Sequence, residues 1–386
     1  MLKELRSLNL KLLSLRSFIV LSICLYYFIG MQISTAEDVT SGLLSHYKII
    51  VISIVLSFFL IFFITHKRSI INRLSTRRAF LVLITWLFLA VIIQQPGLIF
   101  MLIIVLMFSE EDYKKMAGYL FIWISLLFMV FSTLSSLGMI SSGEILKYDL
   151  TVDVSEYKSV IALGMGNPNT AMAFLLGAVM SGAYIFYDTK YRKRYGIIMF
   201  AVTFAVFSLT GSRTGFISLA IFLLLYLFGS FRTSLYLKVF MPLVVVALIM
   251  LSIFVGLRFG STDNAVNDFL TTRPYQWSLR LNNGALTNFV GNSDTYITAI
   301  DRSERYPLDN QYIYFLARGG WLTLVVAIGL YLIGLKRIKS PVVVYMVLIS
   351  LIQCAVESLM FNVVVNTGLI FLLSALLLHK LGKGQI

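Results

Sequence analysis

Long apolar runs follow one another along the whole chain, and they constrain its fold more than any other feature of the sequence. Short segments holding most of the charged residues separate them. An α-helix needs about 20 apolar residues to cross a hydrocarbon core about 30 Å thick. The sequence therefore predicts an all-α, polytopic integral membrane protein with about twelve transmembrane helices. We expect these helices at 17–34, 47–65, 79–94, 97–108, 116–138, 168–187, 195–210, 214–229, 236–257, 310–335, 341–356 and 360–379.

The amino-acid composition argues against a water-soluble fold. The chain has 386 residues, of which 59% are hydrophobic and 13% charged, whereas soluble domains have about 25% charged residues. Too few polar side chains remain to cover a soluble core. Cys24 and Cys354 both lie in apolar runs and are expected to be small hydrophobic residues. We expect residues 1–386 to form a single transmembrane domain.

The positions of the basic residues predict the orientation. The formal net charge is +14, but Lys and Arg occur in short clusters and form no continuous basic face, so no nucleic-acid partner is expected. With a cytoplasmic N-terminus, the inner segments hold 22 of the 32 basic and 5 of the 18 acidic residues, a net +17, and the outer segments have a net −3. Because cytoplasmic segments are enriched in Lys and Arg, both termini are expected to be cytoplasmic.

Three predicted helices begin with polar sequences on the outer side. Each start offers a residue that suits the N-cap position, and proline follows the cap in the first of them. Helix N-termini attract anions through unpaired N–H groups and the helix dipole, so three converging starts would form a diphosphate site. The alternative is that each is an ordinary cap, with glycine nearby for close packing. The residues concerned are Asn167 and Asn169, Ser212 and Arg213, and Asp309 and Asn310.

The outer segment 258–308 is much longer than a usual connection. All of its basic residues are arginine, whose planar guanidinium binds phosphate oxygens in pairs. It also holds the aromatic and asparagine residues that a sugar-binding groove requires. The alternative is a solvated loop in which these arginines pair with the acidic residues of the same segment. The candidate binding residues are Arg273, Trp277, Arg280, Arg302 and Arg305, followed by Arg318 in the next helix.

Metal and ion-coupled chemistries are disfavoured by the residues that the chain lacks. His46, His66 and His379 are its histidines, and none has another metal ligand at a suitable spacing. No phosphate-binding glycine loop for a nucleotide is present. No carboxylate lies in the middle of a predicted span, as an ion relay would need, and Glu357 lies near an outer helix end. We therefore expect no metal and no cofactor.

Several short motifs resemble those of the O-antigen ligase and polysaccharide polymerase superfamily. They are 167–170 (NPNT), 211–215 (GSRTG), 270–277 (LTTRPYQW), Gly291, and 307–312 (PLDNQY) with Gly319 and Gly320. Their order and their outer placement resemble the family over about residues 160–335. Ligases of this family carry a histidine before the asparagine, whereas this chain has Asp309. That difference favours a Wzy-type repeat-unit polymerase.

The resemblance implies a GT-C-like fold in the bacterial cytoplasmic (inner) membrane. It implies an inverting, metal-independent glycosyltransferase that polymerises undecaprenyl-diphosphate-linked repeat units, with lipid-linked donor and acceptor. A chain-length regulator and a flippase are the implied protein partners. In this interpretation Arg213, Arg273 and Arg318 stabilise the leaving diphosphate and Asp309 is the base or orients the acceptor hydroxyl. The implied substrate-binding residues are Asn167, Asn169, Ser212, Trp277, Arg280, Arg302, Arg305, Asn310 and Tyr312.

Three other functions remain open. A ligase of the same superfamily would pass the finished glycan to another acceptor. A peptidoglycan polymerase of the shape-and-division type is a related transferase. A lipid-linked oligosaccharide flippase belongs to a different class, and we would expect it to have two related halves and cationic residues inside its spans, neither of which is visible in the sequence.

Overall fold

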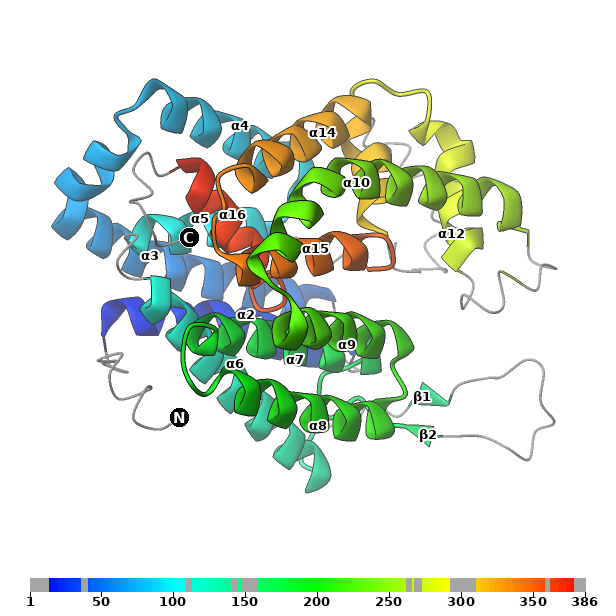
Figure 1. Ribbon diagram of the computed structural model, residues 1–386, viewed down its shortest axis with the longest axis horizontal. Coiled ribbons are helices and arrows are strands. Elements are labelled where there is room, and N and C mark those ends of the chain that lie inside the picture. The colour runs from blue at the N-terminus through cyan, green and yellow to red at the C-terminus, as the bar shows by residue number, and fades with distance from the viewer. Residues whose placement is uncertain are drawn as a thin grey trace.

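The computed structural model describes residues 14–35, 41–108, 113–140, 145–146, 159–261, 266, 273–291, 310–357 and 362–377. This part of the chain is almost entirely helical (Figure 1). Two short strands, β1 (Ile145–Leu146) and β2 (Ser159–Val160), pair antiparallel. The helices are α2 (Leu15–Thr35), α3 (Ser41–Leu74), α4 (Arg77–Ile93), α5 (Pro96–Met107), α6 (Tyr113–Ser136), α7 (Pro168–Phe186), α8 (Arg192–Thr210), α9 (Arg213–Phe228), α10 (Phe231–Phe259), α12 (Arg273–Arg280), the π-helical turn η2 (Leu281–Ala285), α14 (Gln311–Leu335), α15 (Pro341–Cys354) and α16 (Thr367–Leu377).

The protein is a helical membrane protein. Each of the twelve predicted ranges overlaps one of these helices. Six helices in the described residues are long and apolar enough to cross a bilayer: α3 over His46–Asn72, then α6, α7, α8, α10 and α14. The predicted range 360–379 is too long, because α16 begins only at Thr367 and a buried non-helical segment, 362–366, precedes it.

Local signals in the sequence set several helix ends. The Thr76 side chain caps α4 by accepting from the Ala79 N–H. That helix ends at Gln94, which adopts a left-handed conformation, and α5 begins at Pro96. Ser230 and Thr233 form a reciprocal capping box at the start of α10.

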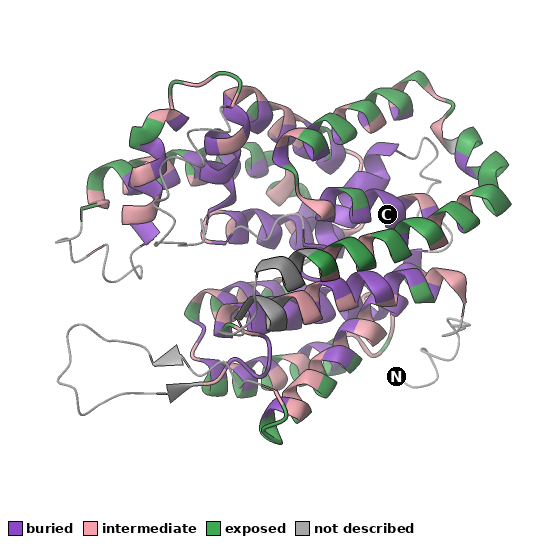
Figure 2. Cartoon of the chain, turned by 180° about the vertical axis from the view of Figure 1, so that it is seen from behind, coloured by how far each residue is buried: buried purple, intermediate pink, exposed green. Residues whose placement is uncertain are grey.

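Three helices form the centre of the bundle. Almost every residue of α7, α15 and α16 is buried, and Figure 2 shows buried residues concentrated towards the middle and exposed ones on the outer helices. On α7, a Cβ at Gly177 would overlap the carbonyl oxygen of Val364. Glycine at this position therefore lets α7 approach the backbone of the buried segment 362–366.

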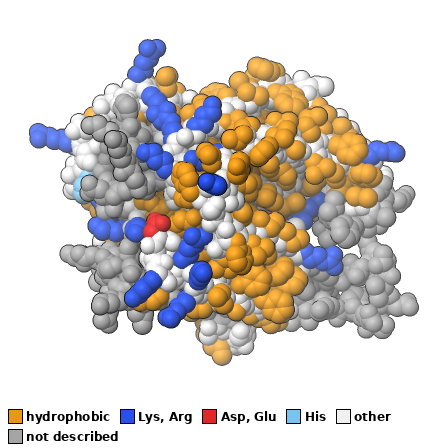
Figure 3. All heavy atoms as spheres, viewed as in Figure 1, with side chains coloured by type: hydrophobic (Ala, Val, Ile, Leu, Met, Phe, Trp, Pro, Cys, Tyr) orange, Lys and Arg blue, Asp and Glu red, His pale blue; other side chains and the backbone are white. Residues whose placement is uncertain are grey.

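The bundle has two opposite ends. In Figure 1 the α3–α4 and α7–α8 connections lie at the left, and β1, β2 and α12 lie at the right. We call the left end the basic end, because the Lys and Arg side chains in Figure 3 gather mainly on the left of the face shown, beside a broad hydrophobic surface. We call the right end the strand end, after β1 and β2. At the basic end, Tyr345 Oη donates to the Ser230 carbonyl at 2.9 Å. At the strand end, the Ile161 N–H donates to the Leu209 carbonyl at 3.2 Å. Each bond joins two segments that we expect, from the distribution of Lys and Arg, to lie on the same side of the membrane.

Candidate functional site

The structure describes most, but not all, of the residues that the sequence singles out. Asp309, Arg302 and Arg305 lie outside the described residues, as does much of the segment 258–308. The described part of that segment contains α12 and η2. The candidate site can therefore be built from α12, the starts of α7, α9 and α14, and the end of α15.

Helix α12 directs its functional side chains to one face. Arg273, Trp277 and Arg280 are spaced at i, i+4 and i+7, which places them on the same side of a helix, and all three are buried. The helix packs on α10: the Trp277 Cβ lies 3.0 Å from where a Cβ would stand at Gly256. The hydroxyl of Ser278 also donates to the Gly260 carbonyl at 3.2 Å. This part of the segment is thus packed against α10 and buried, whereas the acidic residues offered as partners for its arginines lie outside the described residues.

Arg273 forms a buried ion pair with Glu357. Its Nη2 donates to Oε1 of the carboxylate at 2.9 Å, and the partner lies 84 residues further along the chain, just after α15. From the sequence, we expected acidic residues of the same loop to be the partners of this arginine. The pairing with Glu357 was not predicted, because nothing in the sequence brings the two segments together.

Asn310 is the N-cap of α14 and is completely buried. Its Oδ1 accepts from the N–H groups of Tyr312 at 3.0 Å and Ile313 at 3.1 Å. Its Nδ2 donates to Ser252 Oγ on α10 at 2.9 Å and to the Ala355 carbonyl at 2.6 Å. Asn310, rather than Asp309, therefore caps this helix, and its carboxamide fixes the start of α14 against α10 and the end of α15.

These contacts form a closed arrangement that we call the polar circuit. Trp277 of α12 packs on Gly256 of α10, and Ser252, one turn away on α10, binds Asn310 of α14. Asn310 also binds the Ala355 carbonyl, and Glu357, two residues further on, pairs with Arg273 of α12. Two separate sequence motifs, 270–277 and 307–312, contribute to it. The circuit brings polar and charged side chains together at the strand end, in surroundings where they interact strongly because water is largely excluded.

A second group joins the starts of α7 and α9. Asn167 caps α7 by accepting from the Asn169 N–H at 2.8 Å. Ser212 occupies the N-cap position of α9, but its hydroxyl donates to Asn169 Oδ1 at 2.7 Å and makes no capping bond. The expectation that the Ser212 side chain caps the helix is therefore wrong, because the neighbouring asparagine engages it. Gly215 allows this approach, since a Cβ there would overlap Met172 of α7.

Arg213, the first residue of α9, is exposed at this second group. Of the three helix starts, the structure joins two, those of α7 and α9. Within the described residues, no hydrogen bond connects either of them to the start of α14, which belongs to the polar circuit instead.

Arg318 and Tyr312 lie on α14 and are held by protein contacts. Arg318 Nε donates to the Ile92 carbonyl at 3.4 Å, and its Nη2 contacts Gln94 Oε1 at the end of α4. Tyr312 is buried, and its hydroxyl donates to the Leu351 carbonyl at 2.9 Å. We therefore assign Tyr312 a packing role in the described structure.

The segment that follows η2 returns to α14 next to Arg318. Gly320 has φ +66° and interrupts the helix, and the N–H groups of Trp321 and Leu322 bond instead to the carbonyls of Asn288 and Phe289. A Cβ at Gly291 would overlap the backbone of Arg318. Glycines from two of the sequence motifs thus allow the long outer segment to pack directly on α14.

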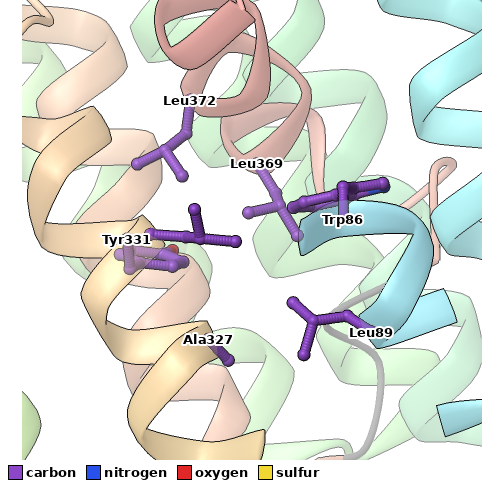
Figure 4. A pocket seen from close by; sticks show the side chains of 7 residues that line it. Trp86, Leu89, Ala327, Tyr331, Leu369 and Leu372 are labelled. Atoms are coloured by element: carbon purple, nitrogen blue, oxygen red, sulfur yellow. The ribbon is translucent and has the colours of Figure 1, made fainter. Parts of the chain in front are cut away.

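An apolar crevice lies between α4, α14 and α16. Figure 4 shows side chains from these helices facing it, among them Trp86, Ala327 and Leu369. Its two polar atoms are bonded within the protein: the Trp86 indole N–H donates to the Leu98 carbonyl and the Tyr331 hydroxyl to the Val347 carbonyl. The crevice offers hydrocarbon contacts and contributes nothing to the polar circuit.

Comparison of the chain with protein-family models, curated proteins and solved structures finds no match.

Proposed function

We propose that the protein is a repeat-unit polymerase, an inverting glycosyltransferase that joins oligosaccharides carried on undecaprenyl diphosphate. The observation that supports this most is the polar circuit, because it joins two of the motifs that resemble the polysaccharide polymerase superfamily. The proposal includes twelve spans, a GT-C-like architecture, and an outward-facing strand end in the bacterial cytoplasmic membrane.

The proposed reaction forms one bond and breaks one. A hydroxyl of the acceptor attacks the anomeric carbon of the donor, the bond between that carbon and the phosphate oxygen breaks, and undecaprenyl diphosphate leaves. The hydroxyl proton passes to a base, for which Asp309 remains our candidate. Inversion follows from a single displacement at the anomeric carbon.

The leaving diphosphate needs cationic partners, and the exposed Arg213 suits this role best. It stands in the first turn of α9, beside N–H groups that the Ser212 side chain leaves uncapped. Such a helix start attracts anions, and arginine adds two parallel donors. Arg273 is already engaged by Glu357, so we assign it a positioning role: it holds α12, on which Trp277 packs against α10 and Arg280 lies on the same side as Trp277.

Reconstitution tests the proposal. The purified protein in liposomes should convert synthetic undecaprenyl-diphosphate-linked repeat units into a ladder of longer glycans, and excess EDTA should leave the rate close to its original value. A deletion strain should then carry surface glycan with single repeat units, whereas loss of a ligase leaves none attached. Failure of the liposomes to produce any ladder would contradict the proposal.

A further inference from the structure

Two connections lie side by side at the basic end, the one between α9 and α10 and the one between α14 and α15. Tyr345 of α15 donates its hydroxyl to the carbonyl of Ser230, just before α10, at 2.9 Å. In the other direction, Lys238 of α10 donates to the carbonyl of Ile338, just before α15. A Cβ at Gly229 would overlap the Tyr345 hydroxyl, so glycine permits this close approach. Each helix thus sends a side chain to the connection that precedes the other helix, and the two bonds hold the connections together.

These connections carry three exposed cations. Arg232 lies in the first turn of α10, and Lys336 and Lys339 lie between α14 and α15. None of the three has an ion pair or a side-chain hydrogen bond with another described residue. The acidic residues in the described ranges are Asp188, in the α7–α8 connection, and Glu357, which is engaged at the strand end. Within the described part of the chain, no carboxylate therefore contacts and balances the three cations.

An exposed apolar stripe begins beside Arg232 and follows α10 away from the basic end. Its residues recur at every fourth position, so they share one face of the helix. Each is more than half exposed, as expected for a membrane-spanning helix face that contacts lipid. Cationic and hydrophobic side chains also adjoin on the face shown in Figure 3. The stripe consists of Phe231, Leu235, Val239 and Leu243.

The cations and the stripe together select the kind of molecule that this surface fits. A free inorganic anion would contact the cations and leave the stripe unused. A neutral phospholipid would cover the stripe and leave the cations unbalanced. An acidic water-soluble protein would reach the cations, but the stripe runs along a membrane-spanning helix, out of its reach. A phospholipid with an anionic headgroup satisfies both, because its headgroup attracts Lys and Arg at the membrane surface while its acyl chains stay in hydrocarbon.

We infer that an anionic phospholipid binds where the two connections meet, with its headgroup between Arg232 and the pair Lys336 and Lys339, and an acyl chain along the α10 stripe. This inference goes beyond the proposed function and does not depend on it. The distribution of basic residues predicts the cytoplasmic leaflet as the source of the lipid. A bound headgroup would link α10 to the connection before α15, and so add to the two hydrogen bonds that already join them.

Lipid titration of the delipidated, full-length protein in a neutral detergent tests the inference. Phosphatidylglycerol should raise its unfolding temperature, and phosphatidylcholine with the same acyl chains, which has no net charge, should raise it much less. The triple variant Arg232→Gln, Lys336→Gln and Lys339→Gln should need about a hundredfold more phosphatidylglycerol for the same shift, because each Lys or Arg near the membrane surface contributes to the attraction.

Three exposed cations around the α3–α4 connection supply the matched control. The variant Lys67→Gln, Arg68→Gln and Arg77→Gln removes the same charge from the same end of the bundle. These cations surround a single connection, whereas the inferred site draws its cations from two that are bonded together. This variant should therefore bind phosphatidylglycerol as the wild type does. Equal weakening in the two triple variants would show that the basic end attracts anions generally, and would overturn the inference.

Measurements on the wild-type protein decide the case if the triple variant does not fold. The shift caused by phosphatidylglycerol should decrease as salt is added, since salt screens exposed charges, and a shift that salt leaves unchanged would overturn the inference. Glycerol 3-phosphate alone should have little effect, and a shift as large as that of phosphatidylglycerol would identify a free-anion site instead. Absence of any shift with phosphatidylglycerol would also overturn the inference, and would leave an acidic protein as the partner of the cations.

Discussion

The guanidinium of Arg273 and the carboxylate of Glu357 meet at 2.9 Å, with both side chains buried, and they connect the outer helix α12 to the end of α15. Burying two charges carries a large desolvation cost, which their attraction offsets only while both are present. The pair therefore contributes chiefly to the position of α12, and through α12 to the positions of Trp277 and Arg280.

Glu357→Gln tests this dependence. The change should lower the unfolding free energy by about 3 kcal/mol, because it removes the carboxylate that Arg273 binds in this buried pair. The double variant Arg273→Met with Glu357→Met should recover most of that loss, since it removes both charges of the pair together. Thermal unfolding in detergent measures both. A double variant as unstable as Glu357→Gln would show that the charge pair is not the cause.

The helices were predictable from the sequence because apolar run length is a local property. The same holds for the Asn167 cap of α7, since the bonded group is the N–H of Asn169, two residues away. The Arg273–Glu357 pair was not predictable, because its members are 84 residues apart and the loop offered nearer acidic residues. The hydrogen bond between Ser212 and Asn169 was also not predictable, because it depends on how closely Gly215 lets α7 and α9 pack.

Gly177→Ala should strongly destabilise the protein. The added Cβ would overlap the carbonyl oxygen of Val364, which is backbone and cannot rotate away. We expect a loss of several kcal/mol, at the upper end of the range for overpacked cores. Gly329→Ala on α14 is the matched control, since no other atom lies within 4 Å of its Cβ position. That variant should match or slightly exceed wild-type stability, because alanine favours helices more than glycine does. Protein yield and unfolding temperature provide the comparison, and equal behaviour of the two variants would contradict the packing described here.

Arg192 holds the end of α9 at the basic end of the bundle. Its Nε donates to the Tyr226 carbonyl at 2.9 Å and its Nη2 to the Gly229 carbonyl at 3.1 Å, and the guanidinium lies 4.2 Å from the centre of the Tyr187 ring. Arg192→Lys should lower the unfolding free energy by about 1–2 kcal/mol, because lysine cannot reproduce the forked bonds and the stacking. Arg194→Lys, at an exposed position, should change it by less than about 0.5 kcal/mol. Urea or thermal unfolding of the two purified variants measures this difference in unfolding free energy. Equal stability of the two variants would contradict the role given to Arg192.

Single cysteines at Ser69 and Asn283 test the orientation. Both positions are exposed, at opposite ends of the bundle, and the native Cys24 and Cys354 are buried and can be replaced. The net +17 and −3 of the two sides place position 283 outside and position 69 in the cytoplasm. An impermeant thiol reagent should therefore label position 283 in intact cells and position 69 only after lysis. The opposite pattern would reverse the topology.

Arg213 allows phosphate binding to be separated from a structural role. Its side chain is exposed at the start of α9, so neither Arg213→Lys nor Arg213→Ala should change protein level or unfolding temperature appreciably. If the guanidinium holds the leaving diphosphate, Arg213→Lys should still lose most activity despite the retained charge, because an ammonium group cannot make the two-pronged contact. Removal of one such donor costs about 3 kcal/mol, or about a hundredfold in rate. Lys193→Arg, an exposed change at the basic end, is the control for the assay. If Arg213→Lys polymerises normally, Arg213 does not belong to the proposed site. The same conclusion follows if Arg213→Ala loses activity only because the protein accumulates poorly.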